Sequence, residues 1–199
     1  MHRYFIIYKP YLVLSQFSPV DGKKTLSDFF SVPKDVYPVG RLDYDSEGLL
    51  ILTNDTSINH QLLNPKHKHE REYWVQVEGD ITSEAIDKLA AGVIISIDGK
   101  SHLTKPCNAT VLTNEINVPE RHPPIRYRKN ISTTWISLVL TEGKNRQVRR
   151  MTASVGFPTL RLIRMRIENV SLREIKPGEM KELSKDVLYQ SLFNKKSST

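Results

Sequence analysis

The sequence contains a single cysteine, Cys107, and no apolar run near the roughly eighteen residues that a membrane-spanning helix needs. One cysteine cannot form a disulfide within the chain, which argues against a disulfide-stabilised secreted scaffold. The first residues, MHRYFIIYKP, hold too short an apolar stretch for a signal peptide and lack its small-residue cleavage site. These absences favour a cytoplasmic protein with no membrane association.

The sequence also lacks the glycine-rich motif GxGxxG and the P-loop, which bind dinucleotides and nucleoside triphosphates. Its six histidines do not stand at metal-ligand spacing with Cys107, so we do not expect a zinc site. We therefore expect neither a cofactor nor a metal ion.

Positive charge is abundant and unevenly distributed. The net charge is +7, and the stretch from Arg121 to Arg166 holds eleven Lys or Arg against one acid, Glu142. That stretch therefore carries +10, and the rest of the chain sums to −3. Such a basic region is typical of a protein that binds a polyanion such as nucleic acid, although a solvated basic surface would give the same pattern.

Hydrophobic periodicity predicts alternating strands and helices. LLILT at 49–53 indicates a buried strand, and REYWVQVEG at 71–79 alternates as a half-buried strand does. Residues 82–93 predict an amphipathic helix capped by Thr82, and 144–156 a second helix that ends at Gly156. The pattern indicates an α+β fold with a mixed, mainly antiparallel sheet and flanking helices.

The long connection at residues 114–130 carries three prolines and four cations, and a loop of this length is usually functional or disordered. We expect one domain over residues 1–199. It could divide into two subdomains, approximately 1–113 and 131–199, that this loop joins and that share a cleft.

Three carboxylates, Asp43, Asp45 and Glu47, alternate in the segment GRLDYDSEGLLILTND at 40–55. They mimic the first half of a calcium-binding EF-hand loop, but Asn54 stands where the loop needs a bidentate Glu. A two-metal nuclease would need further acidic or histidine ligands, which the sequence does not supply. Alternatively, one carboxylate, kept ionised by nearby cations such as Arg41, acts on carbon as nucleophile or base.

This acidic segment resembles the motif around the catalytic aspartate of RsuA-like ribosomal RNA pseudouridine synthases. Three more blocks match the family in order: Tyr8-Lys9-Pro10, the strand at 71–79, and EGKNRQVRRMTASVGFPTLRLIRMRI at 142–167. PPIRxRKxIxTxW at 123–135 is similar to the members that modify the large ribosomal subunit. The resemblance implies the pseudouridine synthase fold, a curved sheet with a central cleft, in a catalytic domain without a separate N-terminal RNA-binding module.

The resemblance also implies roles for individual residues. Asp43 matches the catalytic aspartate, Tyr73 the tyrosine that stacks on the base and accepts the proton from carbon 5, and Arg149 the basic residue that pairs with the aspartate. The implied partner is 23S ribosomal RNA, with transfer RNA and 16S ribosomal RNA left open. No cofactor and no protein partner are implied, and a monomer is the default. With the charge pattern, the resemblance predicts RNA contacts for these cations: Arg41, Arg126, Arg128, Lys129, Lys144, Arg146, Arg150, Arg161 and Arg164.

The residues alone leave alternatives open. Asp43 could serve only to form a turn, Tyr73 could pack in the core, and Arg149 could be a solvated cation. Asp45 and Glu47 are interpreted as structural. A non-catalytic RNA-binding or ribosome-assembly factor and an RNA-cleaving hydrolase are the competing functions.

Overall fold

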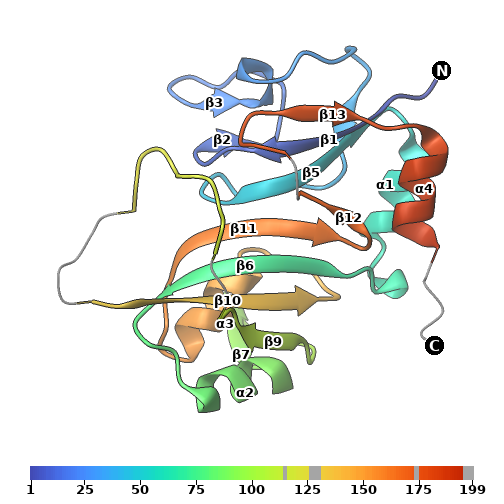
Figure 1. The fold of residues 1–199 in the computed structure, drawn as a ribbon. Coiled ribbons are helices and arrows are strands. Elements are labelled where there is room, and N and C mark those ends of the chain that lie inside the picture. Colours follow the sequence, from blue (N-terminus) through green and yellow to red (C-terminus); the bar gives the residue numbers. More distant parts are fainter. Residues whose placement is uncertain (114–115, 126–130, 173–174, 195–199) are drawn as a thin grey trace. The chain divides into compact units, whose positions relative to one another are not determined.

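A computed structural model gives the fold and describes residues 1–113, 116–125, 131–172 and 175–194 (Figure 1). The chain forms two compact units: unit 1 consists of Met1–His69 and Arg164–Thr199, and unit 2 of Glu70–Ile163. The division therefore falls after residues 69 and 163, not at the 114–130 loop, which belongs to unit 2. No helix in the described part of the chain combines the length and apolar character that crossing a membrane requires.

Unit 1 is built on a sheet with the strand order β13-β1-β5-β11 (Figure 1). β1 runs antiparallel to β5, from Tyr4 opposite Thr53 to Lys9 opposite Gly48, and antiparallel to β13 on its other side. The elements of unit 1 are β1 (Tyr4–Lys9), β2 (Val13–Leu14), β3 (Lys24–Thr25), the 3-10 turn η1 (Leu26–Asp28), β4 (Tyr37–Pro38), β5 (Glu47–Thr53), α1 (Thr56–Leu63), the 3-10 turn η2 (Pro65–His67), the part of β11 (Thr159–Ile167) from Arg164 on, β12 (Val170–Ser171), β13 (Met180–Glu182) and α4 (Lys185–Phe193).

The strand β5 is buried at every position, as expected for the apolar run at 49–53, because a central strand covered on both faces needs no polar alternation. Gly48 is required where β11 approaches. A Cβ on Gly48 would lie 2.4 Å from the carbonyl oxygen of Arg164, and its φ of +113° is one that other residues rarely adopt. The position of β5 fixes the acidic loop that precedes it.

Unit 2 contains a sheet with the order β11-β6-β10-β9 and a separate two-stranded hairpin, β7–β8. β10 pairs antiparallel with β6 on one side and β9 on the other, with Leu138 opposite Tyr73 and Ile136 opposite Val75. The elements of unit 2 are β6 (Arg71–Glu78), α2 (Ser83–Ala91), β7 (Ile94–Ile97), β8 (Lys100–Leu103), β9 (Asn108–Val111), β10 (Thr133–Leu140), α3 (Gln147–Ser154) and the part of β11 up to Ile163.

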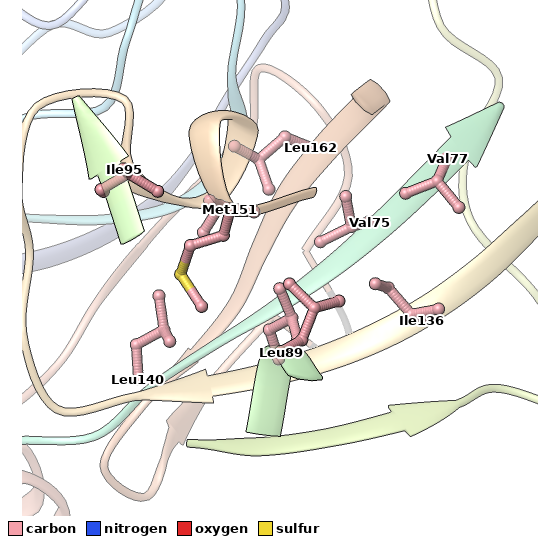
Figure 2. Close-up of a cluster of buried hydrophobic side chains, with 10 residues drawn as sticks. Val75, Val77, Leu89, Ile95, Ile136, Leu140, Met151 and Leu162 are labelled. Atoms are coloured by element: carbon pink, nitrogen blue, oxygen red, sulfur yellow. The ribbon is translucent and has the colours of Figure 1, made fainter. Parts of the chain in front are cut away.

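The core of unit 2 lies between one face of its sheet and the helices α2 and α3. Its buried side chains, gathered in Figure 2, are Val75, Val77, Leu89, Ile95, Ile136, Leu138, Leu140, Val148, Met151 and Leu162. Burying each such side chain contributes about 1.5–3 kcal/mol. Val75 and Val77 lie in this core with Tyr73 packed against it, so the alternation predicted for 71–79 is confirmed.

The predicted helices are confirmed in type. The Thr82 hydroxyl accepts the Ala85 N–H as an N-cap, and Gly156 follows the end of α3 with a φ of +92°. The expected start of α3 at Lys144 is wrong, because Arg146 has a left-handed φ of +51° and the helix begins at Gln147. The antiparallel pairing of β1, β5, β6, β9, β10 and β13 confirms the α+β class with a mainly antiparallel sheet. The central cleft stays a prediction.

Candidate functional site

Asp43 lies in the loop of a β-hairpin in unit 1. β4 pairs antiparallel with β5, and the Val39 N–H donates to the carbonyl oxygen of Ile51 at 2.8 Å, so the loop at 40–46 connects two paired segments. Within it the Ser46 N–H donates to the carbonyl oxygen of Asp43 at 3.0 Å and closes a turn. The Asp43 side chain is half-buried there.

A side chain from outside the hairpin fixes the residue before Asp43. The Leu42 N–H donates to the Ser15 hydroxyl at 3.0 Å, and that hydroxyl donates to the Leu42 carbonyl oxygen at 2.8 Å. Both residues are buried. The Lys23 ammonium lies 5.3 Å from the ring centroid of Tyr44, on the other side of Asp43. The backbone is therefore held by hydrogen bonds at the residue before Asp43, and the side chain of the residue after it contacts Lys23.

Lys9, at the end of β1, is a basic residue of unit 1 that interacts electrostatically with the carboxylates of the acidic loop. It is 0% exposed, and its Nζ donates to the carbonyl oxygens of Pro10 and Val13 at 2.9 and 2.7 Å. Burial lowers the pKa of Lys9 to about 7, although the carboxylates of Glu47, Asp45 and Asp43 act in the opposite direction. Asp43 thus shares a local field with a buried amine, a cation that charge counting did not single out.

Tyr73 and Arg149 both belong to unit 2. Tyr73 is half-buried on β6 and packs against the apolar core, so the structure shows the packing role that was the alternative to catalysis. Arg149 is half-buried on α3. Asp43 belongs to unit 1, so its expected pairing with Arg149 and the stacking role of Tyr73 stay predictions.

The cations predicted to contact RNA fall into four groups, of which Arg150 forms the last by itself. Arg41, Lys144 and Arg146 are exposed, as a phosphate contact requires. Arg161 and Arg164 are buried, at 6% and 5% exposure, and Arg164 donates from Nε to the carbonyl oxygen of Leu49 at 2.8 Å. These two arginines therefore gain no support for a direct phosphate contact. Arg126, Arg128 and Lys129 lie outside the described residues.

Arg150 makes contacts within unit 2. Its guanidinium donates to the carbonyl oxygen of Ser96 and, at 3.2 Å, to the side-chain oxygen of Asn145. A cation engaged in this way is only partly available to a phosphate.

The acidic loop offers no metal-binding arrangement. Within the described ranges, no three His, Cys, Asp or Glu side chains form a group that could hold a metal ion, and this includes Asp43, Asp45 and Glu47. Glu47 is buried at the start of β5, in keeping with a structural role.

Sequence reasoning missed Ser15 and Lys9 as supports of the loop. The position of Lys9 at the end of the apolar strand YFIIYK could have indicated its supporting role, because an ammonium at the end of a buried strand needs hydrogen-bond partners. Ser15 gave no signal, since 27 residues separate it from its partner Leu42.

The chain is similar to known proteins in both sequence and structure. Residues 3–154 match the model of a family described as RNA pseudouridylate synthase. The ribosomal large subunit pseudouridine synthase E of Vibrio parahaemolyticus is 48% identical over 178 residues, covering 89% of this chain and 72% of the relative. The protein of the same name from Xanthomonas campestris is 48% identical over 176 residues, covering 87% of this chain and 91% of the relative. A crystal structure of a pseudouridylate synthase matches with a TM-score of 0.78 and 25% identity, over 96% of this chain and 74% of that one.

Proposed function

We propose, on the premise that the chain belongs to the RNA pseudouridylate synthase family, that its target is one uridine of large-subunit ribosomal RNA. The chain is an isomerase that converts uridine to pseudouridine in RNA. The relatives from Vibrio and Xanthomonas carry names that specify the large ribosomal subunit, which supports 23S RNA over transfer RNA and 16S RNA. A ribosomal substrate in turn supports a cytoplasmic location.

The reaction breaks the bond from N1 of the base to C1′ of the ribose and forms a bond from C5 to C1′. One proton leaves C5 and one is taken up at N1, so the product is an isomer and the balance needs no redox partner. The target base must first leave its stack, at a cost of a few kcal/mol. Phosphate contacts from Arg41, Lys144 and Arg146 would offset part of that cost.

We assign the bond exchange to Asp43. Its carboxylate either adds to C1′ of the ribose or removes a sugar proton to leave a glycal; both routes need an ionised, oriented carboxylate. We assign to Tyr73 the stacking on the displaced base and the acceptance of the C5 proton, and to Arg149 the pairing with Asp43. These assignments require no cofactor.

The observation that supports the assignment of the bond exchange to Asp43 is its fixed position in the loop. Its turn is closed by the Ser46 N–H, the preceding residue is bonded twice to Ser15, and the buried Lys9 lies in the same local field. A positioned carboxylate is what attack on a sugar carbon requires.

The test is pseudouridine mapping on defined RNA. Purified protein is incubated with transcripts of 23S RNA, 16S RNA and transfer RNA in EDTA, and new pseudouridine is located chemically. We expect one modified uridine in 23S RNA and no strand cleavage. Parallel reactions contain Mg²⁺ in place of EDTA. Strand cleavage that occurs with Mg²⁺ and stops in EDTA would support a hydrolase, and binding without modification would support an assembly factor.

A further inference from the structure

Glu142 is a buried carboxylate that the proposed reaction does not use. It lies between β10 and α3 at 6% exposure, and its Oε1 accepts the Lys105 N–H at 2.9 Å and the Gln147 side-chain amide at 2.7 Å. Its Oε2 lies 3.4 Å from Nε2 of His102. One side chain therefore connects the segment after β8 to the first residue of α3.

Gln147 completes this connection. It is 4% exposed, its side-chain oxygen accepts the Lys144 N–H at 2.9 Å, and its own N–H donates to the Lys144 carbonyl oxygen at 3.1 Å. The amide group thus donates to Glu142 and accepts from Lys144, which leaves one orientation that satisfies both. The turn before α3, with Arg146 in the left-handed region, is fixed by these bonds.

Arg150 bonds the same first turn of α3 to β7. Its guanidinium donates to the Ser96 carbonyl oxygen in β7 and to Asn145. Through Lys105 and Ser96, the first turn of α3 is bonded at two points to the segment that carries the β7–β8 hairpin.

We propose that Glu142 and Gln147 are positioning residues, whose hydrogen-bonded pair orients the first turn of α3 and thereby the guanidinium of Arg149. The inference rests on the role proposed for Arg149. Gln147 and Arg149 are two positions apart, roughly 200° around the helix. Gln147 faces the buried hydrogen bonds with Glu142, so fixing Gln147 also fixes the opposite side of the helix, which carries Arg149. A displacement of about 1 Å at a reacting group can cost about a hundredfold in rate, and Arg149 stands at the end of a long side chain.

The test exchanges the two side chains. Gln147→Glu places two acceptors against each other, and we expect kcat to fall about tenfold to a hundredfold while KM changes less than about threefold. The double variant Glu142→Gln with Gln147→Glu restores one donor opposite one acceptor between the two side chains, but the Lys105 N–H, which donates to the same oxygen of Glu142 in wild type, then faces an amide nitrogen. We therefore expect the double variant to recover only part of the lost kcat, to a value clearly above that of Gln147→Glu alone. Unfolding temperatures of all variants show that each is folded at the assay temperature.

Gln147→Glu combined with Arg149→Ala tests whether the Glu142–Gln147 pair acts on kcat through Arg149. If the pair acts through Arg149, Gln147→Glu should cause little further loss there, because effects that share one path are not additive. A wild-type kcat in Gln147→Glu overturns the inference, as does a failure of the double variant to recover, or an equal loss in the Arg149→Ala background. If Gln147→Glu does not fold, Gln147→Met replaces it with the same expected loss, and a wild-type kcat there overturns the inference. A wild-type protein that forms no pseudouridine would refute the proposed function instead.

Discussion

The hydroxyl of Ser15 both accepts the N–H of Leu42 and donates to its carbonyl oxygen, at 3.0 and 2.8 Å. A single side chain thus satisfies both backbone groups of the residue before Asp43, in a buried environment. The segment after β1 therefore controls the conformation of a loop that follows 27 residues later.

Ser15→Ala should loosen this loop. Two buried backbone groups of Leu42 would lose their partner, which costs about 1–3 kcal/mol for each group left unsatisfied. We expect a lower unfolding temperature and a reduced kcat, since Asp43 would lose its fixed position. Ser18→Ala, an exposed serine on the same segment, is the matched control and should change neither. Equal behaviour of the two variants would show that the Ser15 bonds do not hold Asp43.

Asp43→Asn should abolish isomerisation and leave RNA affinity within about a few fold. The amide keeps the shape of the side chain but cannot act as nucleophile or base. Single-turnover assays and RNA-binding titrations measure the two effects separately. Asp45→Asn, two residues along the same loop, is the control and should retain most activity. Retained activity in Asp43→Asn would disprove its catalytic assignment.

Tyr73→Phe should separate binding from product formation. The ring is kept, so stacking and packing against the core of unit 2 survive, but the hydroxyl that accepts the C5 proton is lost. General acid–base groups contribute about a hundredfold to ten-thousandfold, and final product should fall by that order. If Tyr73 only packs, Phe will be fully active, and Tyr73→Leu will lower the unfolding temperature without a selective catalytic defect.

Lys9 predicts a pH dependence of stability. Burial lowers its pKa from 10.5 to about 7, so between these values the unfolded chain binds more protons than the folded one. The free energy of unfolding contributed by Lys9 should therefore rise with pH across this window, by at most about 1.4 kcal/mol per pH unit. Denaturant unfolding of wild type and Lys9→Met between pH 7 and 10 measures the difference, which should shift in favour of wild type. A flat difference would mean that the amine titrates as it does in water, and a falling difference would mean that folding raises its pKa; either would contradict the prediction.

RNA binding should depend steeply on salt. If about five phosphates of a single strand are neutralised, log affinity should fall against log salt with a slope of roughly −3 to −4. Neutralising Arg126, Arg128 and Lys129 together should flatten the slope by about 2. Neutralising three exposed lysines outside the basic stretch, at positions 176, 181 and 185, should leave it unchanged. Equal slopes for the two triple variants would remove 126–129 from the RNA interface.

Local patterns predicted the elements of the fold well. The alternation of Tyr73, Val75 and Val77 identified the buried face of β6, and Thr82 identified a helix start, because period and capping depend on neighbours in sequence. The division into units was not predictable in the same way. It depends on pairings such as Phe5 with Glu182, which no local pattern encodes.

The site was predictable only in part. A motif located Asp43, but charge counting treated Arg161 and Arg164 as surface cations, although both are buried in a strand. Counting cannot distinguish an exposed arginine from one that bonds a backbone carbonyl, as Arg164 does with Leu49. Ser15 and Gln147, which we propose to support reactive groups, have ordinary polar side chains, and only their hydrogen bonds point to such a role.

The order of the units along the chain has a consequence for synthesis on the ribosome. Unit 2 is one continuous segment, whereas unit 1 joins Met1–His69 to residues from Arg164 onward. When the loop with Asp43 has been made, β1 and β5 still lack the neighbouring strands β13 and β11. Translating residues 70–163 takes on the order of 5–20 s at typical rates. For that interval the growing polypeptide exposes unpaired edges of its most apolar strands, and it is then most dependent on chaperones.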